Sequence, residues 1–176
     1  DPGRKPHENR QFLLLLACIL KAVDTHADLL RESAANVGND HRLGAHEAPP
    51  AIISVFLGEQ LDDVLQQLLR TGSATHSARG GTLHTGVKTL PDVIKDATDR
   101  NRTSPFAFTS NKFEFRMVGS RDSISPSTVV INTIVAEALA DACDILEQAE
   151  DFDTALHDLT IQYIAEHQKI ICGGNG

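Results

Sequence analysis

Apolar residues recur along most of this chain at the spacing expected of α-helices. A nine-residue apolar run, 12–20, lies within the segment 6–33, which predicts one long helix buried in the protein interior. Segment 59–70 has leucine and valine at helical spacing, which is typical of an amphipathic helix.

The second half of the chain predicts further helices. Segment 129–150 has a broad apolar face, and Ser127 or Thr128 is its expected N-cap. A last helix is expected over about 153–171, and a short one over 91–97.

Three short segments carry β-strand signals. Segment 51–57 is apolar and β-branched and follows two prolines, which favour extended backbone before them. Segments 102–108 and 111–118 flank an expected turn at Thr109 and Ser110. We therefore expect an α+β fold in which long helices flank a small antiparallel set of strands.

The second strand of this expected hairpin alternates between charged and aromatic residues. Because positions two apart share one face of a strand, Lys112, Glu114 and Arg116 should point one way, with Phe113 and Phe115 buried on the other side. Two cations and one carboxylate in a row suit a site that handles anionic ligands and a metal. The commoner explanation of such a run is an edge strand with a solvated charged face.

A second polar cluster lies in the segment 37–50, which is expected to be a loop between two apolar elements. It contains Asp40, His41, Arg42 and Glu47 and is closed by two prolines. Loops held by rigid neighbours often carry binding residues, although charged loops without a binding role are ordinary.

Composition narrows the class of protein. The 176 residues fit one domain or a piece of a larger one, and the net charge of −8 argues against nucleic acid or an anionic membrane as the main partner. The three cysteines are scattered and show no metal-binding spacing, which indicates a reducing compartment. No signal peptide is visible, and the longest apolar run is shorter than the ~20 residues that cross a bilayer.

Taken together, the two polar clusters resemble a known enzyme family. HRLGAHEAPPAIISVFLG at 41–58, followed by DRNRTSPFAFTSNKFEFRMVGS at 99–120, is similar in order and spacing to the C-terminal part of the catalytic domain of glutamine synthetase, and most of all to the long bacterial type III branch. The resemblance implies that residues 1–176 form such a segment, with the N-terminal β-grasp domain and the upstream catalytic part outside it.

What the resemblance implies about function is specific. Glutamine synthetases join glutamate to ammonia with ATP, through γ-glutamyl phosphate, and use Mg²⁺ or Mn²⁺. The family implies a cytoplasmic homo-oligomer of stacked rings with no nucleic-acid or membrane partner. Because its other metal-binding residues precede the matched region, the isolated chain is expected to be inactive.

The resemblance also implies roles for residues of the first cluster and for one arginine of the second. Arg42 and Arg116 would bind the carboxylate of glutamate, because a planar guanidinium matches a carboxylate. Glu47 would attract ammonium and take its proton, as a positioned carboxylate can. The alternatives are a surface ion pair for Arg42 and a turn-stabilising carboxylate for Glu47.

The remaining roles concern ATP and the metal. The resemblance implies that Arg102 and Lys112 contact ATP phosphates and that Glu114 is a ligand of the metal ion that bridges them. The alternative for Glu114 is an ion pair with Lys112 and Arg116 on one strand face. Ala107 stands where many family members carry a second arginine, which weakens the case for an unchanged phosphate site.

Two other functions remain open at this point. A glutamate–amine ligase with a polyamine-type acceptor would share the phosphate and metal chemistry. A non-catalytic structural or interaction module would keep the fold alone.

Overall fold

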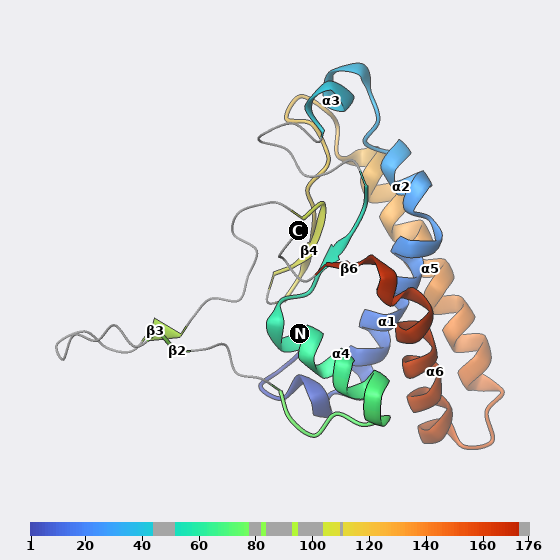
Figure 1. The fold of residues 1–176 in the computed structure, drawn as a ribbon. Coiled ribbons are helices and arrows are strands. Elements are labelled where there is room, and N and C mark those ends of the chain that lie inside the picture. The colour runs from blue at the N-terminus through green and yellow to red at the C-terminus, as the bar shows by residue number, and fades with distance from the viewer. Residues whose placement is uncertain (44–51, 78–81, 84–92, 95–103, 110, 173–176) are drawn as a thin grey trace.

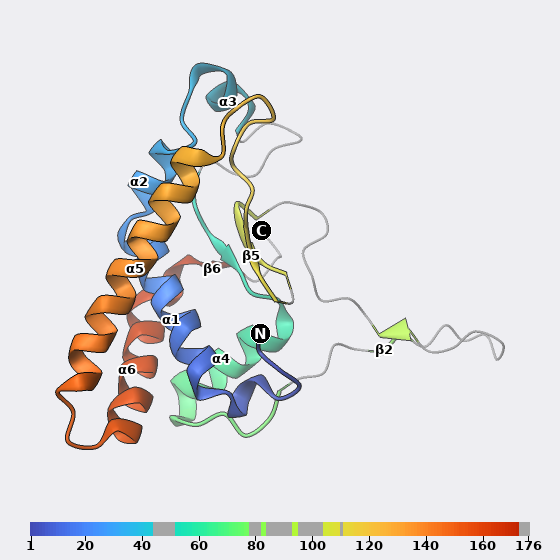
Figure 2. The same cartoon turned by 180° about the vertical axis from the view of Figure 1, so that it is seen from behind.

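Three helices lie together on one side of a four-stranded sheet: α1 (Arg10–Thr25), α5 (Ser125–Glu147) and α6 (Phe152–His167) (Figures 1 and 2). The structure is a computed structural model, and it describes residues 1–43, 52–77, 82–83, 93–94, 104–109 and 111–172.

Helix α1 is the centre of the core. The Asn9 side chain accepts a hydrogen bond from the Phe12 backbone N–H at 3.0 Å, which caps the helix at its first turn. The helix then packs against α5 and α6. Its buried residues are Phe12, Leu13, Leu16, Ala17, Cys18, Leu20, Ala22 and Val23.

The prediction of one helix over 6–33 is wrong, because the structure divides this segment into three helical elements. A 3₁₀ turn, η1 (Pro6–Glu8), precedes the Asn9 cap, and α2 (Ala27–Glu32) follows a break at His26. His26 leaves the helical region with φ −116° and ψ 31°, and its Nε2 lies 2.9 Å from a carboxylate oxygen of Glu137 on α5.

The expected helix over 129–150 is present as α5, but neither expected cap residue caps it. The helix begins at Ser125 with proline in its first turn, where a missing N–H costs nothing. Ser127 is instead buried, and its hydroxyl accepts a hydrogen bond from that of Ser33 at 2.9 Å. The last helix, α6, is capped by Asp151, whose side chain accepts from the backbone of Asp153 and Thr154.

The amphipathic helix predicted over 59–70 is confirmed as α4 (Glu59–Thr71). It buries Leu61, Val64, Leu65 and Leu68 and ends at Gly72, whose φ of 70° is the left-handed conformation that glycine adopts without strain. After α6, a 3₁₀ turn η2 (Gln168–Ile170) leads into strand β6 (Ile171–Cys172), so the expected final helix stops earlier than predicted.

The sheet is mixed, so the expectation of an antiparallel set is only partly correct. Its order is β5 (Phe113–Phe115), β4 (Phe106–Phe108), β1 (Val55–Phe56) and β6. Strands β4 and β5 form the predicted antiparallel hairpin, whereas β1 pairs in parallel with both β4 and β6. The parallel pairings join segments far apart in the sequence, through connections that contain helices.

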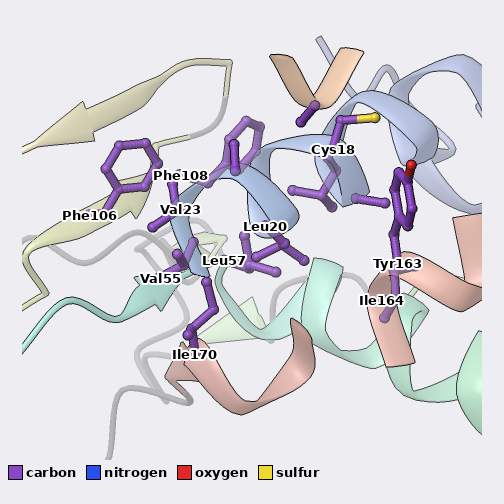
Figure 3. Close-up of a cluster of buried hydrophobic side chains, with 14 of the residues drawn as sticks. Cys18, Leu20, Val23, Val55, Leu57, Phe106, Phe108, Tyr163, Ile164 and Ile170 are labelled. Carbon is purple, nitrogen blue, oxygen red and sulfur yellow. The ribbon is translucent and has the colours of Figure 1, made fainter. Parts of the chain in front are cut away.

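One face of the sheet closes the core. Phe106 and Phe108 of β4 lie beside Val55 and the residues of α1, as the close-up shows (Figure 3). The rings of Phe12 and Phe108 have centroids 5.8 Å apart, which joins α1 directly to the sheet. By alternation along the strands, Phe56 and Ala107 face the other way; both are buried, yet neither belongs to this cluster.

Two smaller elements differ from expectation. Helix α3 (Val37–Arg42) forms where a polar loop was predicted, because the Asn36 side chain caps it by accepting from the Asn39 N–H at 2.8 Å. Strands β2 (Thr82–Leu83) and β3 (Val93–Ile94) pair antiparallel, so the short helix expected over 91–97 is wrong at 93–94. Among the described residues, no helix has both the length and the hydropathy that a membrane span requires.

Adjacent leucines on α1 test whether the core depends on this helix. Leu16 is 1% exposed and Leu15 is 41% exposed. We expect Leu16→Ala to lower the free energy of unfolding by about 2–5 kcal/mol, because it removes buried surface and leaves a cavity. Leu15→Ala, the matched control, should cost less than about 1 kcal/mol. Equal losses in urea denaturation of the two variants would contradict this packing.

Candidate functional site

The hairpin of β4 and β5 sorts its aromatic and charged residues onto opposite faces. In its register, Phe106 lies opposite Phe115, and Phe108 opposite Phe113. Ring centroids of the neighbouring aromatic pairs lie 5.1–6.2 Å apart, which is the range for favourable aromatic contacts. The predicted alternation is therefore confirmed, although Phe113 and Phe115 are only partly buried.

The charged face of the hairpin is organised around the Glu114 carboxylate. Its Oε1 lies 3.0 Å from Lys112 Nζ and accepts from Thr109 Oγ1 at 3.2 Å. Its Oε2 accepts from Nε and Nη2 of Arg116 at 3.3 and 3.1 Å. The three charged side chains thus meet on one face, as the sequence predicts, and carry one net positive charge.

These contacts favour the ionised form of Glu114. The hydrogen bond from Lys112, followed by that from Arg116, lowers the pKa of Glu114 below its ordinary value of 4.5. Glu114 is therefore ionised at neutral pH and holds both cations in place. The Arg116 side chain is 12% exposed and that of Lys112 is 62% exposed, so Arg116 is the more firmly enclosed of the two.

Glu114 does not form a metal site together with the other described residues. A carboxylate has about four lone-pair positions, and Glu114 already accepts from four donor atoms on Lys112, Thr109 and Arg116. In the part of the chain that the structure describes, no three His, Cys, Asp or Glu side chains gather to hold a metal ion. A cation at Glu114 would have to displace a donor and find its other ligands elsewhere.

Arg42 reaches the same hairpin from α3. Its Nη2 donates to the carbonyl oxygen of Met117, the residue after Arg116, at 3.2 Å. Both views show α3 beside the segment that joins β5 to α5 (Figures 1 and 2). The structure therefore brings Arg42 to the end of β5, the strand that carries Glu114 and is flanked by Lys112 and Arg116.

Asn39 is the residue that sequence reasoning did not single out. Its amide nitrogen donates to the carbonyl oxygens of Ala34 at 2.6 Å and Met117 at 2.7 Å. Its amide oxygen accepts from Arg42. The spacing of three residues between Asn39 and Arg42 is the signal available in the sequence, because on a helix it places both side chains on one face.

Two of the predicted site residues, Glu47 and Arg102, lie outside the described residues. Their proposed roles stay predictions.

The loop after β5 comes very close to α3. Asn36 donates to the Asp122 carboxylate at 2.8 Å, and Asp122 folds back over Gly119. A Cβ atom at Gly119 would overlap the Asp122 carboxylate and come within 3.4 Å of the Asn39 amide oxygen. Only glycine leaves room for this arrangement of Asp122 and Asn39.

Comparison with curated proteins finds relatives of one enzyme family. The chain is 45% identical over 179 residues to the type-3 glutamine synthetase of Dictyostelium discoideum, an alignment that covers all of this chain and 24% of that protein. It is 40% identical over 181 residues to a glutamine synthetase of Bacteroides fragilis, covering 99% of this chain and 25% of that protein. It is also 39% identical over 181 residues to a glutamine synthetase of Butyrivibrio fibrisolvens, an alignment that covers all of this chain and 25% of that protein. No family model matches the chain.

These relatives confirm the resemblance drawn from the two polar clusters. The chain is similar along its whole length to glutamine synthetases, one of them of type 3. It spans about a quarter of the length of the relatives that it matches.

A pair of glycines tests the close approach of the loop to α3. Gly119→Ala should lower the free energy of unfolding by about 0.5–1.5 kcal/mol, because the added methyl group displaces the exposed Asp122 carboxylate and breaks its hydrogen bond with Asn36. Gly38→Ala is the matched control: its Cβ would meet only Asn36 Oδ1, at 3.5 Å, and in a helix alanine is about 0.5–1 kcal/mol better than glycine. A Gly119→Ala protein as stable as the Gly38→Ala protein in urea denaturation would refute this packing.

Proposed function

We propose that this chain is the C-terminal segment of the catalytic domain of a glutamine synthetase, and that it supplies substrate-binding side chains to that enzyme. In the proposed reaction, the γ-carboxylate of glutamate attacks the terminal phosphoryl group of ATP, which gives γ-glutamyl phosphate and ADP. Ammonia then displaces phosphate to form glutamine. The whole-length similarity to three glutamine synthetases supports the family reaction.

The observation that carries the proposal is the fixed position of the Arg116 guanidinium. Glu114 holds it through Nε and Nη2, and the backbone N–H of Arg116 donates to the Pro105 carbonyl oxygen at 2.8 Å. A pre-positioned guanidinium loses little freedom when it binds a carboxylate. Arg116 therefore suits the role of binding a carboxylate of glutamate.

Lys112 is far more exposed than Arg116. Its ammonium is a point charge on a long stem, held by Glu114 alone among the ion pairs of the described residues. Such a group can move toward a phosphate oxygen, which is the role that we assign to it and to Arg102. We assign proton transfer from ammonium to Glu47, whose carboxylate would attract ammonium and take one proton from it, which leaves ammonia to attack.

The role of a divalent cation is limited by what the described residues offer. When bound, Mg²⁺ or Mn²⁺ would neutralise charge on the ATP phosphates. Glu114 is the residue of this chain that we expect to contribute a ligand, but its lone pairs are engaged and no companion ligands lie among the described residues. We therefore assign no step of the reaction to the metal.

Two variants of the full-length protein test the assignment, since each removes one cation from Glu114. Arg116→Ala should raise the KM for glutamate about 10- to 100-fold, because a charge-assisted hydrogen bond is lost, and should leave the KM for ATP nearly unchanged. Lys112→Ala should raise the KM for ATP and spare that for glutamate. Steady-state kinetics with each substrate varied separately distinguish these outcomes.

If both variants change only the amount of folded protein, with unaltered KM values in the folded fraction, the cluster is structural. If both change the same KM value, the division of roles between Arg116 and Lys112 is wrong.

A further inference from the structure

Arg42 is held by a neutral side chain. Its Nε and Nη2 donate to the Asn39 amide oxygen at 3.1 and 2.7 Å, and Nη2 also donates to the Met117 carbonyl oxygen at 3.2 Å. No carboxylate among the described residues pairs with Arg42, and the neighbouring acid, Asp40, pairs with Arg31 at 2.7 Å. The positive charge of Arg42 is therefore not compensated within this part of the chain.

Asn39 is suited to hold Arg42 because its own hydrogen bonds are all satisfied. It is 3% exposed, and its two amide N–H groups donate to the carbonyl oxygens of Ala34 and Met117. A buried amide with every partner present is strongly oriented, since rotating it would leave polar groups unpaired. The Asn39 oxygen is thus fixed at one position beside the guanidinium.

The contacts leave the Nη1 group of Arg42 for a ligand. A guanidinium has five N–H donors, and the three hydrogen bonds above use those on Nε and Nη2. The Nη1 group makes no hydrogen bond with the residues that the structure describes. A carboxylate bound there would meet a guanidinium that is already oriented and still carries its full charge.

We propose that Asn39 is a positioning residue for glutamate binding. Asn39 acts by orienting Arg42 and by fixing Arg42 in position relative to Arg116. Both ends of the Asn39 amide group contribute. The amide oxygen orients the Arg42 guanidinium, and an amide N–H donates to the carbonyl oxygen of Met117, the residue after Arg116. The inference rests on the proposed function, because it takes Arg42 and Arg116 as the residues that bind the glutamate carboxylate.

The chemistry explains why an amide serves here and a carboxylate would not. Aspartate at position 39 would accept from Arg42 but would neutralise its charge, and it has no N–H to give to Ala34 and Met117. Two neighbouring carbonyl oxygens would then face a buried anion. Asn39→Asp keeps the size of the side chain and changes only these properties.

The test uses the full-length enzyme with four variants: Asn39→Ala, Asn39→Asp, Arg42→Ala and the double variant Asn39→Ala with Arg42→Ala. We expect both Asn39 variants to raise the KM for glutamate roughly 10-fold, on the scale of one charge-assisted hydrogen bond, and to leave the KM for ATP unchanged. The double variant should have the glutamate KM of Arg42→Ala alone, because Asn39 acts through Arg42.

Asn36→Ala is the matched control for a purely structural role. Asn36 caps α3 through the Asn39 N–H and bonds Asp122, and none of the hydrogen bonds of Arg42 goes to Asn36. This variant should lower the melting temperature without changing the KM for glutamate. If Asn39→Ala fails to fold, Asn39→Asp decides the question, because it preserves the shape of the buried side chain.

Three results would overturn the inference, and they are distinguishable. If Asn39→Asp behaves like Asn36→Ala, with lower stability and an unchanged KM for glutamate, then Asn39 is structural. If the effects of Asn39→Ala and Arg42→Ala on the glutamate KM add in the double variant, Asn39 does not act through Arg42. If Arg42→Ala itself leaves the glutamate KM unchanged, the proposed role of Arg42 fails and the inference fails with it.

Discussion

The burial of helix α1 is the constraint on which the rest of the structure depends. Its apolar residues contact α5 and α6 on its sides, and the sheet through Phe12 and Phe108. One face of the sheet is therefore sealed by hydrocarbon, where an unpaired charge would be costly. Glu114 and the flanking Lys112 and Arg116 are left with the opposite face of β5, the strand that forms one edge of the sheet.

Two arginines near the end of β5 are held in different ways, and the difference has chemical consequences. Arg116 is fixed by the carboxylate of Glu114, whereas Arg42 is fixed by the amide of Asn39. A carboxylate partner offsets part of the cation's charge, and an amide partner does not. Among the described residues, the pair thus combines a guanidinium whose charge is partly offset with one whose charge no carboxylate offsets, which would suit the carboxylates of the proposed substrate, glutamate.

The parts of the fold that local pattern determines could be predicted from the sequence. Helix α4 has apolar residues at helical spacing and a glycine end, and the β4–β5 hairpin alternates residue by residue. The same alternation predicted that Lys112, Glu114 and Arg116 share one face. The parallel partners of β1 could not be predicted, because its two paired residues give no pattern that selects β4 and β6 over other strands. The break at His26 follows no local signal, and its ring pairs with Glu137, more than a hundred residues away.

In the candidate site too, contacts between sequence neighbours could be predicted, and contacts between distant segments could not. The cluster on β5 was predictable because its members are neighbours in sequence, and the family resemblance gave them roles. The role of Asn39 could not be predicted, because its amide meets the Met117 carbonyl oxygen only once α3 has docked beside the loop after β5. The requirement for glycine at position 119 could not be predicted either. It arises because the Asp122 carboxylate folds over this residue and occupies the place of a side chain.

The central proposal is that this chain supplies substrate-binding residues to a glutamine synthetase and is not active by itself. It spans about a quarter of the length of its relatives, and the residues that the structure describes contain no group able to hold a metal ion. The most direct measurement is glutamine formation from glutamate, ammonium and ATP with Mg²⁺, made on the full-length protein and on the purified 176-residue chain. We expect activity that requires all three substrates from the full-length protein and none from the chain. Turnover by the chain alone, or a full-length protein that is inactive with these substrates, would contradict the account.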